Sequence, residues 1–380
     1  MESLLSLTSR RAGEWFKEEL RLVGGLDHIA DTVIGVGEKL AALPSGFDPT
    51  NLELIERLSG CLRVLENVTF LNTENQQYLL ELNDCGLVKA FASLLPLCAE
   101  RVESCREEER KLRIGKEKTP GGRMRLCLLA LLRVLLNITH DNEWGSMKVG
   151  EQVGLISNTL FCVLQAAQYI AHDQRFDLLV LSLGVLINLV EHCPGNAKIL
   201  TNTKTNYSYD AQTDGNSQFS NSGQVCSLES LTQLFMQRYY AASRAEREPD
   251  PGEEQHDDED EDYSEAQAGL EWVEIETSGT GGPDDLTEEE IKRSVSKVLH
   301  TAGKHMEDSI VASYTALLIG CLVKDNHMNV TRVRSFLPDG DFNCMVQMLQ
   351  KFLSFIELTN AAGNTGSKSI SKIIEVLDHL

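Results

Sequence analysis

Glycine-rich stretches and histidines are the residues of this 380-residue chain whose spacing could build a catalytic or cofactor site. The stretch GVGEKL (35–40) lacks the third glycine and the preceding strand that a dinucleotide site requires. The stretch GNTGSKS (363–369) places a serine between the glycine and the lysine that are adjacent in a phosphate-binding loop. His300 and His305 do not form the HExxH pair of a zinc protease. We therefore expect both glycine stretches to be loops, and we expect no cofactor or metal site.

The sequence also contains no motif that indicates nucleophilic or acid–base catalysis. No GxSxG motif occurs, and an acidic run cannot hold two carboxylates in a fixed geometry. The ten cysteines include no CxxC pair, and several lie in apolar runs where a thiol acts as a small hydrophobic group. The chain shows no N-terminal signal pattern and no apolar stretch of membrane-spanning length. These observations predict a protein without enzymatic activity in a reducing, intracellular compartment.

The net charge of −22 is concentrated in one segment. Residues 246–290 contain 20 Asp and Glu and one Arg, a balance of −19, which leaves −3 for the other 335 residues. This balance disfavours DNA binding by bulk charge and predicts disorder in the acidic run. Within that run GLEWVEIET (269–277) carries Trp272, Val273 and Ile275 between glutamates. This stretch is a linker, or it docks on the folded body or on a partner.

The elements that would position any site are helices. The phrases LRVLENVTFLNTEN (62–75) and LRVLLNITHDNEWG (132–145) are nearly identical, LGVLINLVEHCPGNAKIL (183–200) follows the same frame, and YTALLIGCLVKDN (314–326) follows it more loosely. Apolar residues at helical spacing surround most of each helix, so each helix needs cover on both sides. Neighbouring repeats provide that cover in a solenoid. The phrases thus predict the inner helices of stacked repeats.

The resulting fold class is all-α, a right-handed α-solenoid of degenerate HEAT or armadillo-like repeats with a disordered acidic insertion. We expect N-terminal repeats in residues 1–200, a polar and then acidic insertion in 201–287 with one helix near 225–245, and C-terminal repeats in 288–380. Residues 105–125 are expected to form an exposed, charged loop. Four prolines are expected at helix boundaries. These are Pro44, Pro96, Pro194 and Pro338.

Asn67, Asn137 and Asn188 occupy the same place in three of the phrases. The first two complete N-x-T patterns, but they lie in apolar helices, which disfavours glycosylation. In armadillo domains an equivalent row of asparagines binds the backbone of an extended peptide. The favoured alternative is that each Asn bridges neighbouring repeats through hydrogen bonds to backbone.

The stretch GKHMEDSIVASYTALLIGCL (303–322) follows the acidic insertion and is expected to open a helix. Its predicted buried stripe is Ile310, Tyr314, Leu317, Leu318 and Cys321. Counting back in helical steps leaves Lys304, His305, Glu307 and Asp308 toward solvent or a groove. Met306 is then either the first core residue of the helix, which the periodicity alone favours, or an exposed apolar anchor in a charged rim.

Long unusual strings make the chain similar to a known family, the wings-apart-like (Wapl) cohesin release factors, in their C-terminal domain. The strings span both ends of the chain, whereas the polar linkers and the acidic insertion match poorly. They are SRRAGEWFKEELRLVGGLDHI, HDNEWGS, VLINLVEH, GKHMEDSIVASYTALL, LPDGDF, KFLSFIELT and GNTGSKSISKIIEVL.

The resemblance implies a HEAT-repeat scaffold that binds cohesin through its kleisin and stromal-antigen subunits. It implies cooperation with another HEAT-repeat regulator and opening of the gate between the kleisin and an SMC head. A nuclear, chromatin-bound protein with a cytoplasmic pool follows, with no small-molecule substrate, membrane or direct DNA contact. A monomer is expected, as for other solenoids with polar caps. The family's N-terminal half carries FGF motifs, which these residues lack, so binding that depends on those motifs is expected to be missing.

The resemblance also implies where the binding surface lies. The family's cohesin-contacting surface is in its C-terminal half, which favours the exposed interpretation of Met306. Its neighbours Lys304, His305, Glu307, Asp308 and Ile310 then belong to the same candidate surface. A second candidate surface closes the second repeated phrase. It consists of Asp141, Asn142, Glu143 and Trp144, and Trp144 could equally be a hydrophobic residue that packs at the turn.

Overall fold

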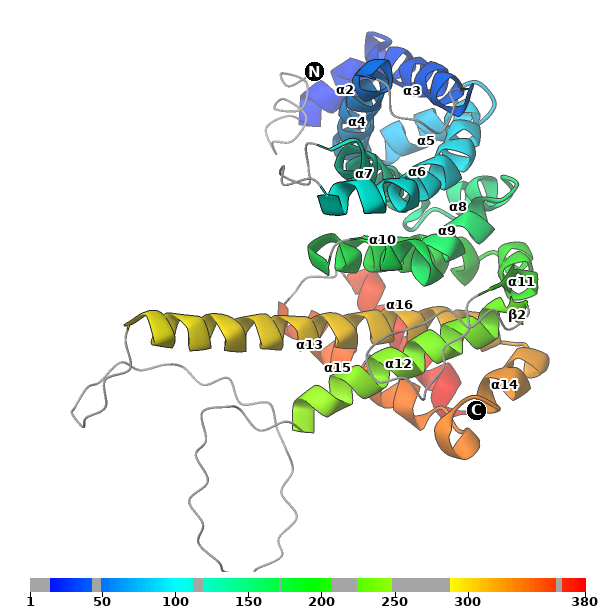
Figure 1. Ribbon diagram of the computed structural model, residues 1–380. Helices are drawn as coiled ribbons and strands as arrows, with labels where there is room; N and C mark the ends of the chain where they lie inside the picture. The colour runs from blue at the N-terminus through cyan, green and yellow to red at the C-terminus, as the bar shows by residue number, and fades with distance from the viewer. Residues whose placement is uncertain are drawn as a thin grey trace, which may run out of the picture.

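The computed structural model describes residues 14–42, 49–111, 119–170, 172–206, 224–247, 288–359 and 364–380, which form a stack of helices (Figure 1). The strands within these residues are β1 (Lys204–Thr205) and β2 (Val225–Cys226). They pair antiparallel, with Lys204 opposite Cys226. The expected all-α solenoid is confirmed.

Within these described ranges the helices form five units of three, each with a first helix of eight or nine residues followed by two longer ones. The first two units are α2 (Glu14–Leu22), α3 (Gly25–Ala42), α4 (Pro49–Thr69) and α5 (Thr73–Glu81), α6 (Gly86–Lys111), α7 (Pro120–Thr139). The next two are α8 (Glu143–Gly150), α9 (Leu155–Leu164), α10 (His172–Glu191) and α11 (Pro194–Asn202), α12 (Ser227–Arg247), α13 (Glu288–Val323). The last is α14 (His327–Arg334), α15 (Asn343–Thr359), α16 (Asn364–Asp378), and short 3-10 turns occur at Ala166–Gln168 and Pro338–Gly340.

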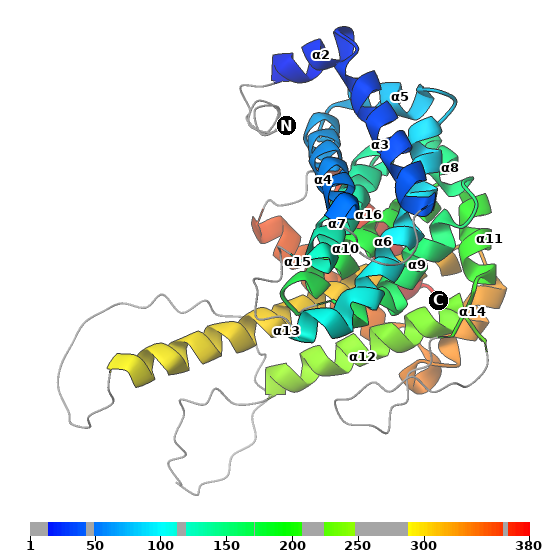
Figure 2. The same cartoon turned by 45° about the horizontal axis from the view of Figure 1, so that its top comes forward.

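The third helices of successive units pack against one another in the order α4, α7, α10, α13 and α16. The second helices α3, α6, α9 and α12 form a parallel layer beside them (Figures 1 and 2). All four repeated phrases end a third helix, as the sequence predicts. The phrase is therefore repeated because it builds the inner layer of the stack.

A single hydrophobic cluster runs through all five units, from Leu20 to Leu377. In α7 fourteen of twenty residues are buried, so this helix needs neighbours on nearly every side. The ten cysteines are free thiols and eight of them are buried. Burial raises the pKa of Cys127 and of Cys162 to about 12, so both act as small apolar groups.

The turns after the third helices share one geometry. Leu71, Asp141 and Asp325 have φ values of 51°, 48° and 57°, in the left-handed region. The Asn that follows each of them caps the next helix, accepting a hydrogen bond from the backbone N–H three residues on. The third copy differs, because Cys193 precedes Pro194 at the first position of α11 and makes no side-chain cap.

Several local expectations were wrong. Pro96 lies inside α6, and residues 105–111 extend that helix instead of opening a loop. The glycines of GVGEKL lie within α3, and residues 364–369 begin α16. Neither glycine stretch is the loop that we expected. Of the other expected features, the helix near 225–245 corresponds to α12, which packs along α13, while Pro44 and the acidic stretch 269–277 lie outside the described residues.

Candidate protein-binding surfaces

The KHMED stretch lies in the middle of α13, a helix of 36 residues that begins at Glu288. The expectation that this stretch opens the helix was therefore wrong. Met306 is 51% exposed and is the described apolar residue of this helix that protrudes most. Lys304 and His305 belong to the same helical turn, but their side chains lie outside the described residues.

Ile310 and Tyr314 follow Met306 at helical spacing and mark the passage from surface to core. Both are partly buried and pack against the hydrophobic cluster. The ring of Tyr314 lies 5.6 Å from that of Phe352 on α15. Met306, Ile310 and Tyr314 thus form one stripe along α13, exposed at Met306 and packed against the core at Tyr314. The packing of Ile310 and Tyr314 limits the motion of the backbone that carries Met306.

Asp308 does not face solvent, contrary to our expectation. It is 7% exposed, and its Oδ1 accepts a hydrogen bond of 2.6 Å from Arg238 Nη1 on α12. A buried carboxylate requires such a partner, because desolvation of an unpaired charge is costly. Glu307 is partly buried. The charged rim expected around Met306 therefore does not include Asp308. This residue instead joins α13 to α12 through its ion pair with Arg238.

The second candidate set, Asp141 to Trp144, forms the turn between α7 and α8. Asp141 adopts the left-handed conformation, and Asn142 Oδ1 accepts a 2.8 Å hydrogen bond from the N–H of Gly145. Glu143 is exposed, while Trp144 is partly buried against the core. Three of these four residues thus have a structural role, as the alternative for Trp144 supposed.

The structure does not bring the two sets together. The first set lies in the middle of α13, in the inner layer of the fourth unit, whereas α8 runs along one edge of the stack (Figures 1 and 2). A partner would therefore have to extend across more than one unit to contact both sets.

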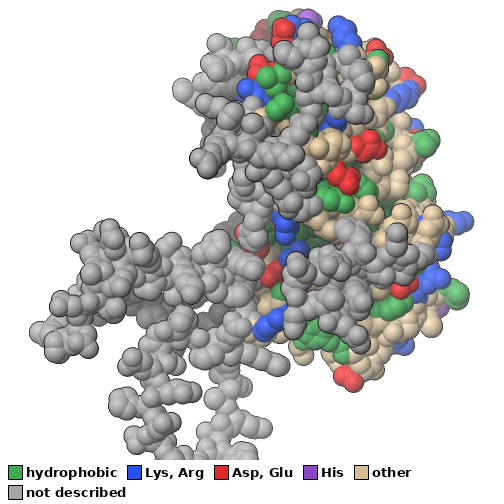
Figure 3. All heavy atoms as spheres, viewed as in Figure 1, with side chains coloured by type: hydrophobic (Ala, Val, Ile, Leu, Met, Phe, Trp, Pro, Cys, Tyr) green, Lys and Arg blue, Asp and Glu red, His purple; other side chains and the backbone are tan. Residues whose placement is uncertain are grey.

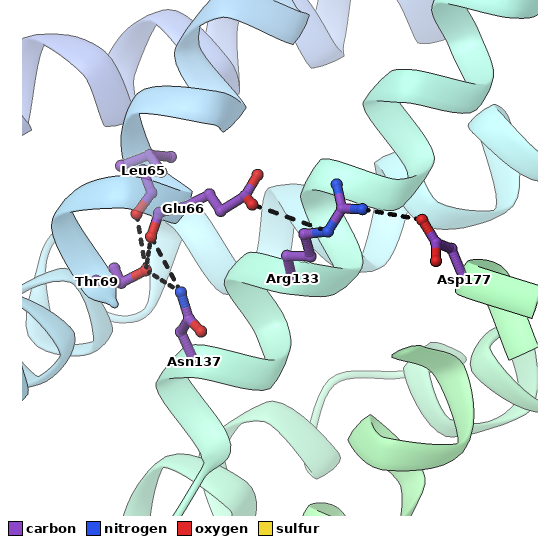
Figure 4. A network of polar contacts seen from close by, with 6 residues as sticks. All are labelled: Leu65, Glu66, Thr69, Arg133, Asn137 and Asp177. Carbon is purple, nitrogen blue, oxygen red and sulfur yellow. Dashed lines mark hydrogen bonds and ion pairs between the residues drawn. The ribbon is translucent and has the colours of Figure 1, made fainter. Parts of the chain in front are cut away.

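The asparagine row bridges successive units. Asn137 Nδ2 donates to the Glu66 carbonyl and to Thr69 Oγ1, both at 3.0 Å (Figure 4). Asn188 Nδ2 makes the same pair of bonds one unit later, to the Leu136 carbonyl at 3.4 Å and to Thr139 Oγ1 at 3.1 Å. The bridging interpretation is confirmed for these two asparagines.

A chain of charges that the sequence analysis missed lies beside this bridge. Arg133 on α7 stands between Glu66 on α4, at 3.8 Å, and Asp177 on α10, at 3.3 Å (Figure 4). Burial raises the pKa of Glu66, although Arg133 and Arg63 act in the opposite direction. The signal was present in the phrases themselves, because Arg63 and Arg133 occupy equivalent positions.

A second group of missed residues consists of buried amides one turn after the caps. Asn75, Asn196 and Asn329 each donate a hydrogen bond to a carbonyl seven residues earlier, at 3.1, 2.8 and 2.7 Å. Asn196 also reaches the Ser146 carbonyl of the preceding unit at 3.0 Å. Their repetition at a fixed distance from the caps was the available signal.

The described residues contain no group of three His, Cys, Asp or Glu side chains that could hold a metal ion. One window, Met306–Val323, is long and apolar enough to cross a membrane by composition alone. Two-thirds of it is buried against other helices, as in the core helix of a folded domain.

Comparison with known proteins identifies a matching protein family. The family model described as "Wings apart-like protein regulation of heterochromatin" matches residues 1–196, which span the first three units and the start of α11. This chain belongs to the wings apart-like family. Its membership agrees with the resemblance carried by the sequence strings.

Individual wings apart-like proteins match the whole chain, including α13. The human wings apart-like protein homolog is 45% identical over 400 residues, covering 100% of this chain and 33% of the human protein. The Drosophila melanogaster protein wings apart-like is 31% identical over 385 residues, covering 99% of this chain and 20% of its own length. The Caenorhabditis elegans homolog 1 is 26% identical over 404 residues, covering 100% and 49%. The chain thus spans between a fifth and a half of the relatives' lengths.

Proposed function

We propose that this chain is a non-enzymatic scaffold that binds cohesin and promotes its release from chromatin. It would contact the kleisin and stromal-antigen subunits, favour opening of the gate between the kleisin and the SMC head, and cooperate with a HEAT-repeat regulator. Membership of the wings apart-like family and the match along the whole chain support this proposal.

One structural observation supports the proposed position of the cohesin-binding contact on α13. Met306 exposes half of its side chain on a helix that is otherwise packed on several sides. A flexible, polarisable side chain of this kind is suited to fill an apolar pocket in a partner. The Arg238–Asp308 pair and the Tyr314–Phe352 contact hold its helix in place, so little ordering is required on binding.

We further propose a regulatory role at chromatin, in the nucleus with a cytoplasmic pool, during sister chromatid cohesion, as membership of the wings apart-like family suggests. Binding by shape and apolar contact requires no small molecule, no membrane and no direct DNA contact. The near-neutral balance of the chain outside residues 246–290 is consistent with this form of recognition.

An armadillo-like peptide adaptor was the alternative function. That function would use the amides of Asn137 and Asn188 to read a peptide backbone. Both Nδ2 groups are already engaged with the preceding unit. No observation on this row favours the adaptor.

Calorimetry would test the proposal with the full chain and a purified kleisin–stromal-antigen complex. We expect the wild type to bind and Met306→Ala to weaken affinity at least tenfold, equivalent to about 1.4 kcal/mol. Leu22→Ala on α2 is the matched control, because Leu22 is also an exposed apolar residue, at 72%, but lies in another unit.

Circular dichroism would establish that both variants remain folded. Absence of binding by the wild type would overturn the proposed function. Equal affinity of wild type and Met306→Ala would overturn the assignment of the anchor.

A further inference from the structure

The first helices of the units change charge along the stack. Helix α5 carries two glutamates and no basic residue, a balance of −2, and α8 carries Glu143 and Lys148, a balance of zero. Helix α11 carries only Lys198, a balance of +1, and α14 carries Arg332 and Arg334, a balance of +2. The strands β1 and β2 between them add Lys204 and no carboxylate. One edge of an acidic protein is therefore basic in its C-terminal half.

Two of the basic residues adjoin the same residue of β2. The backbone of Lys204 lies opposite Cys226 in the two-stranded ladder, and Arg332 Nη1 donates a hydrogen bond of 3.3 Å to the sulfur of Cys226. Exposed cationic residues from β1 and α14 thus flank Cys226. Among the described residues, Lys198, Lys204 and Arg332 form no ion pair.

Exposed apolar side chains accompany these charges. Met328 is 79% exposed and lies one helical turn before Arg332, and Phe336, 36% exposed, follows one turn after it. Ile199 on α11 is 49% exposed and occupies the place in its unit that Arg332 occupies in the next. Figure 3 shows basic and hydrophobic side chains together along the right-hand edge of the molecule. We call Lys198, Ile199, Lys204, Met328, Arg332 and Phe336 the α11–α14 ridge.

Cationic and apolar groups side by side select an acidic segment that also carries apolar side chains. A nucleic acid would satisfy the charges and leave Met328 and Ile199 exposed. The acidic insertion contains a segment with both properties. In GLEWVEIET (269–277) Trp272, Val273 and Ile275 alternate with glutamates, inside the region whose balance is −19. We propose that residues 269–277 of the same chain dock on the α11–α14 ridge.

The covalent connection permits this contact. Helix α12 starts at the ridge, where the N–H of Ser227 donates to the Thr203 carbonyl at 3.0 Å. Its 21 residues end about 30 Å away. The 24 residues from 248 to 271 span up to about 80 Å when extended, so Trp272 can return over that distance. A tether of this length gives an effective concentration on the order of millimolar, which supports even a weak contact.

Tryptophan fluorescence of the full chain would test the docking. The chain has three tryptophans, so replacing Trp15 and Trp144 by Phe leaves Trp272 as the sole reporter. We expect acrylamide to quench Trp272 about half as efficiently as it quenches a free peptide of residues 257–277, because a docked indole is shielded. K204E/R332E should raise quenching to the value of the peptide, and 0.5 M salt should act in the same direction.

Two further variants separate charge from apolar contact. K39E/R57E changes the net charge equally, on exposed residues of the first unit, and should leave quenching unchanged. Ile199→Ser with Met328→Ser removes only apolar contact and should also release Trp272. Circular dichroism confirms that each variant remains helical.

Three results would overturn the proposal. Trp272 that is quenched as easily as the free peptide shows no docking. Protection of Trp272 from acrylamide that persists in both K204E/R332E and the Ile199→Ser, Met328→Ser variant would mean that residues 269–277 dock elsewhere. Protection that appears only as protein concentration rises assigns the contact to a second copy of the chain. No cohesin subunit enters the experiment, so its outcome is independent of the proposed function.

Discussion

The inner layer is held together differently in its two halves. Between α4 and α7, and again between α7 and α10, an Asn of one unit donates to a Thr hydroxyl and a carbonyl of the unit before. Between α10 and α13 the equivalent residues are Val190 and Cys321, which are both apolar. Among the described residues, no hydrogen bond occupies that place in the fourth unit.

Thr and Asn thus occur together at two of these interfaces, and both are absent from the equivalent positions of the third. Thr69 faces Asn137, and Thr139 faces Asn188, whereas Val190 precedes Cys321. The N-x-T pattern of Asn137 and Thr139 is thereby explained, because Asn137 binds the unit before and Thr139 accepts a hydrogen bond from the unit after. In the fourth unit, the Arg238–Asp308 ion pair instead joins α13 to α12.

Loss of the Arg238–Asp308 ion pair should destabilise the protein more than any other change considered. Asp308→Ala should lower the free energy of unfolding by roughly 3 kcal/mol, because it leaves the Arg238 guanidinium largely buried without its partner. Urea denaturation followed by circular dichroism measures the change. Lys89→Ala is the control, since its ion pair with Asp84 is exposed on both sides. Equal stability of Asp308→Ala and wild type would mean that apolar packing alone holds α12 on α13.

An intermediate effect is expected for the bridge. Thr139→Val and Asn188→Cys should each cost about 1 kcal/mol, because each removes a hydrogen bond from a partly buried partner. The double variant recreates the residue types of the α10–α13 interface and should cost less than the sum, by about 0.5–1 kcal/mol. Urea denaturation of the four proteins gives this coupling energy.

The reverse substitutions apply the same test to the fourth unit. Val190→Thr with Cys321→Asn would introduce the bridge into the fourth unit, and the two changes should again be coupled favourably. Strict additivity in both cycles would show that the Thr–Asn pairs do not interact energetically.

A weaker pH dependence of stability is expected in the N-terminal half, from Glu66. Burial raises the pKa of Glu66, so this residue contributes stability when protonated, below its ordinary pKa of 4.5, and loses that contribution as pH rises through the folded-state value. Relative to Glu66→Gln, the wild type should therefore become less stable as pH rises above 4.5. Denaturation midpoints between pH 4 and pH 7 measure this trend, with Glu53→Gln, an exposed residue of α4, as control. Parallel profiles for wild type and Glu66→Gln would contradict it.

The helices of the inner layer could be predicted because their apolar pattern is local. The same pattern gave the bridging role of Asn137 as the favoured interpretation. The burial of Asp308 could not be predicted, since its partner Arg238 lies 70 residues earlier, across the acidic insertion. Helical periodicity shows which residues share a face of one helix. Whether that face is buried depends on whether a second helix packs against it. Pro96 was misplaced for a related reason, because tertiary packing retains a proline that local preference would place at a helix end.

The paired residues also fix the order of the units. Unit three presents an Asn to the unit before it and a Val to the unit after it, so its two faces are not interchangeable. Removing that unit would set the apolar Cys321 against Thr139, and duplicating it would set Asn188 against Val190. Growth or loss of whole units is thus penalised at these junctions. Changes in length are better tolerated inside a unit, as between α12 and α13, so this solenoid is expected to diversify through its insertions while its number of repeats stays constant.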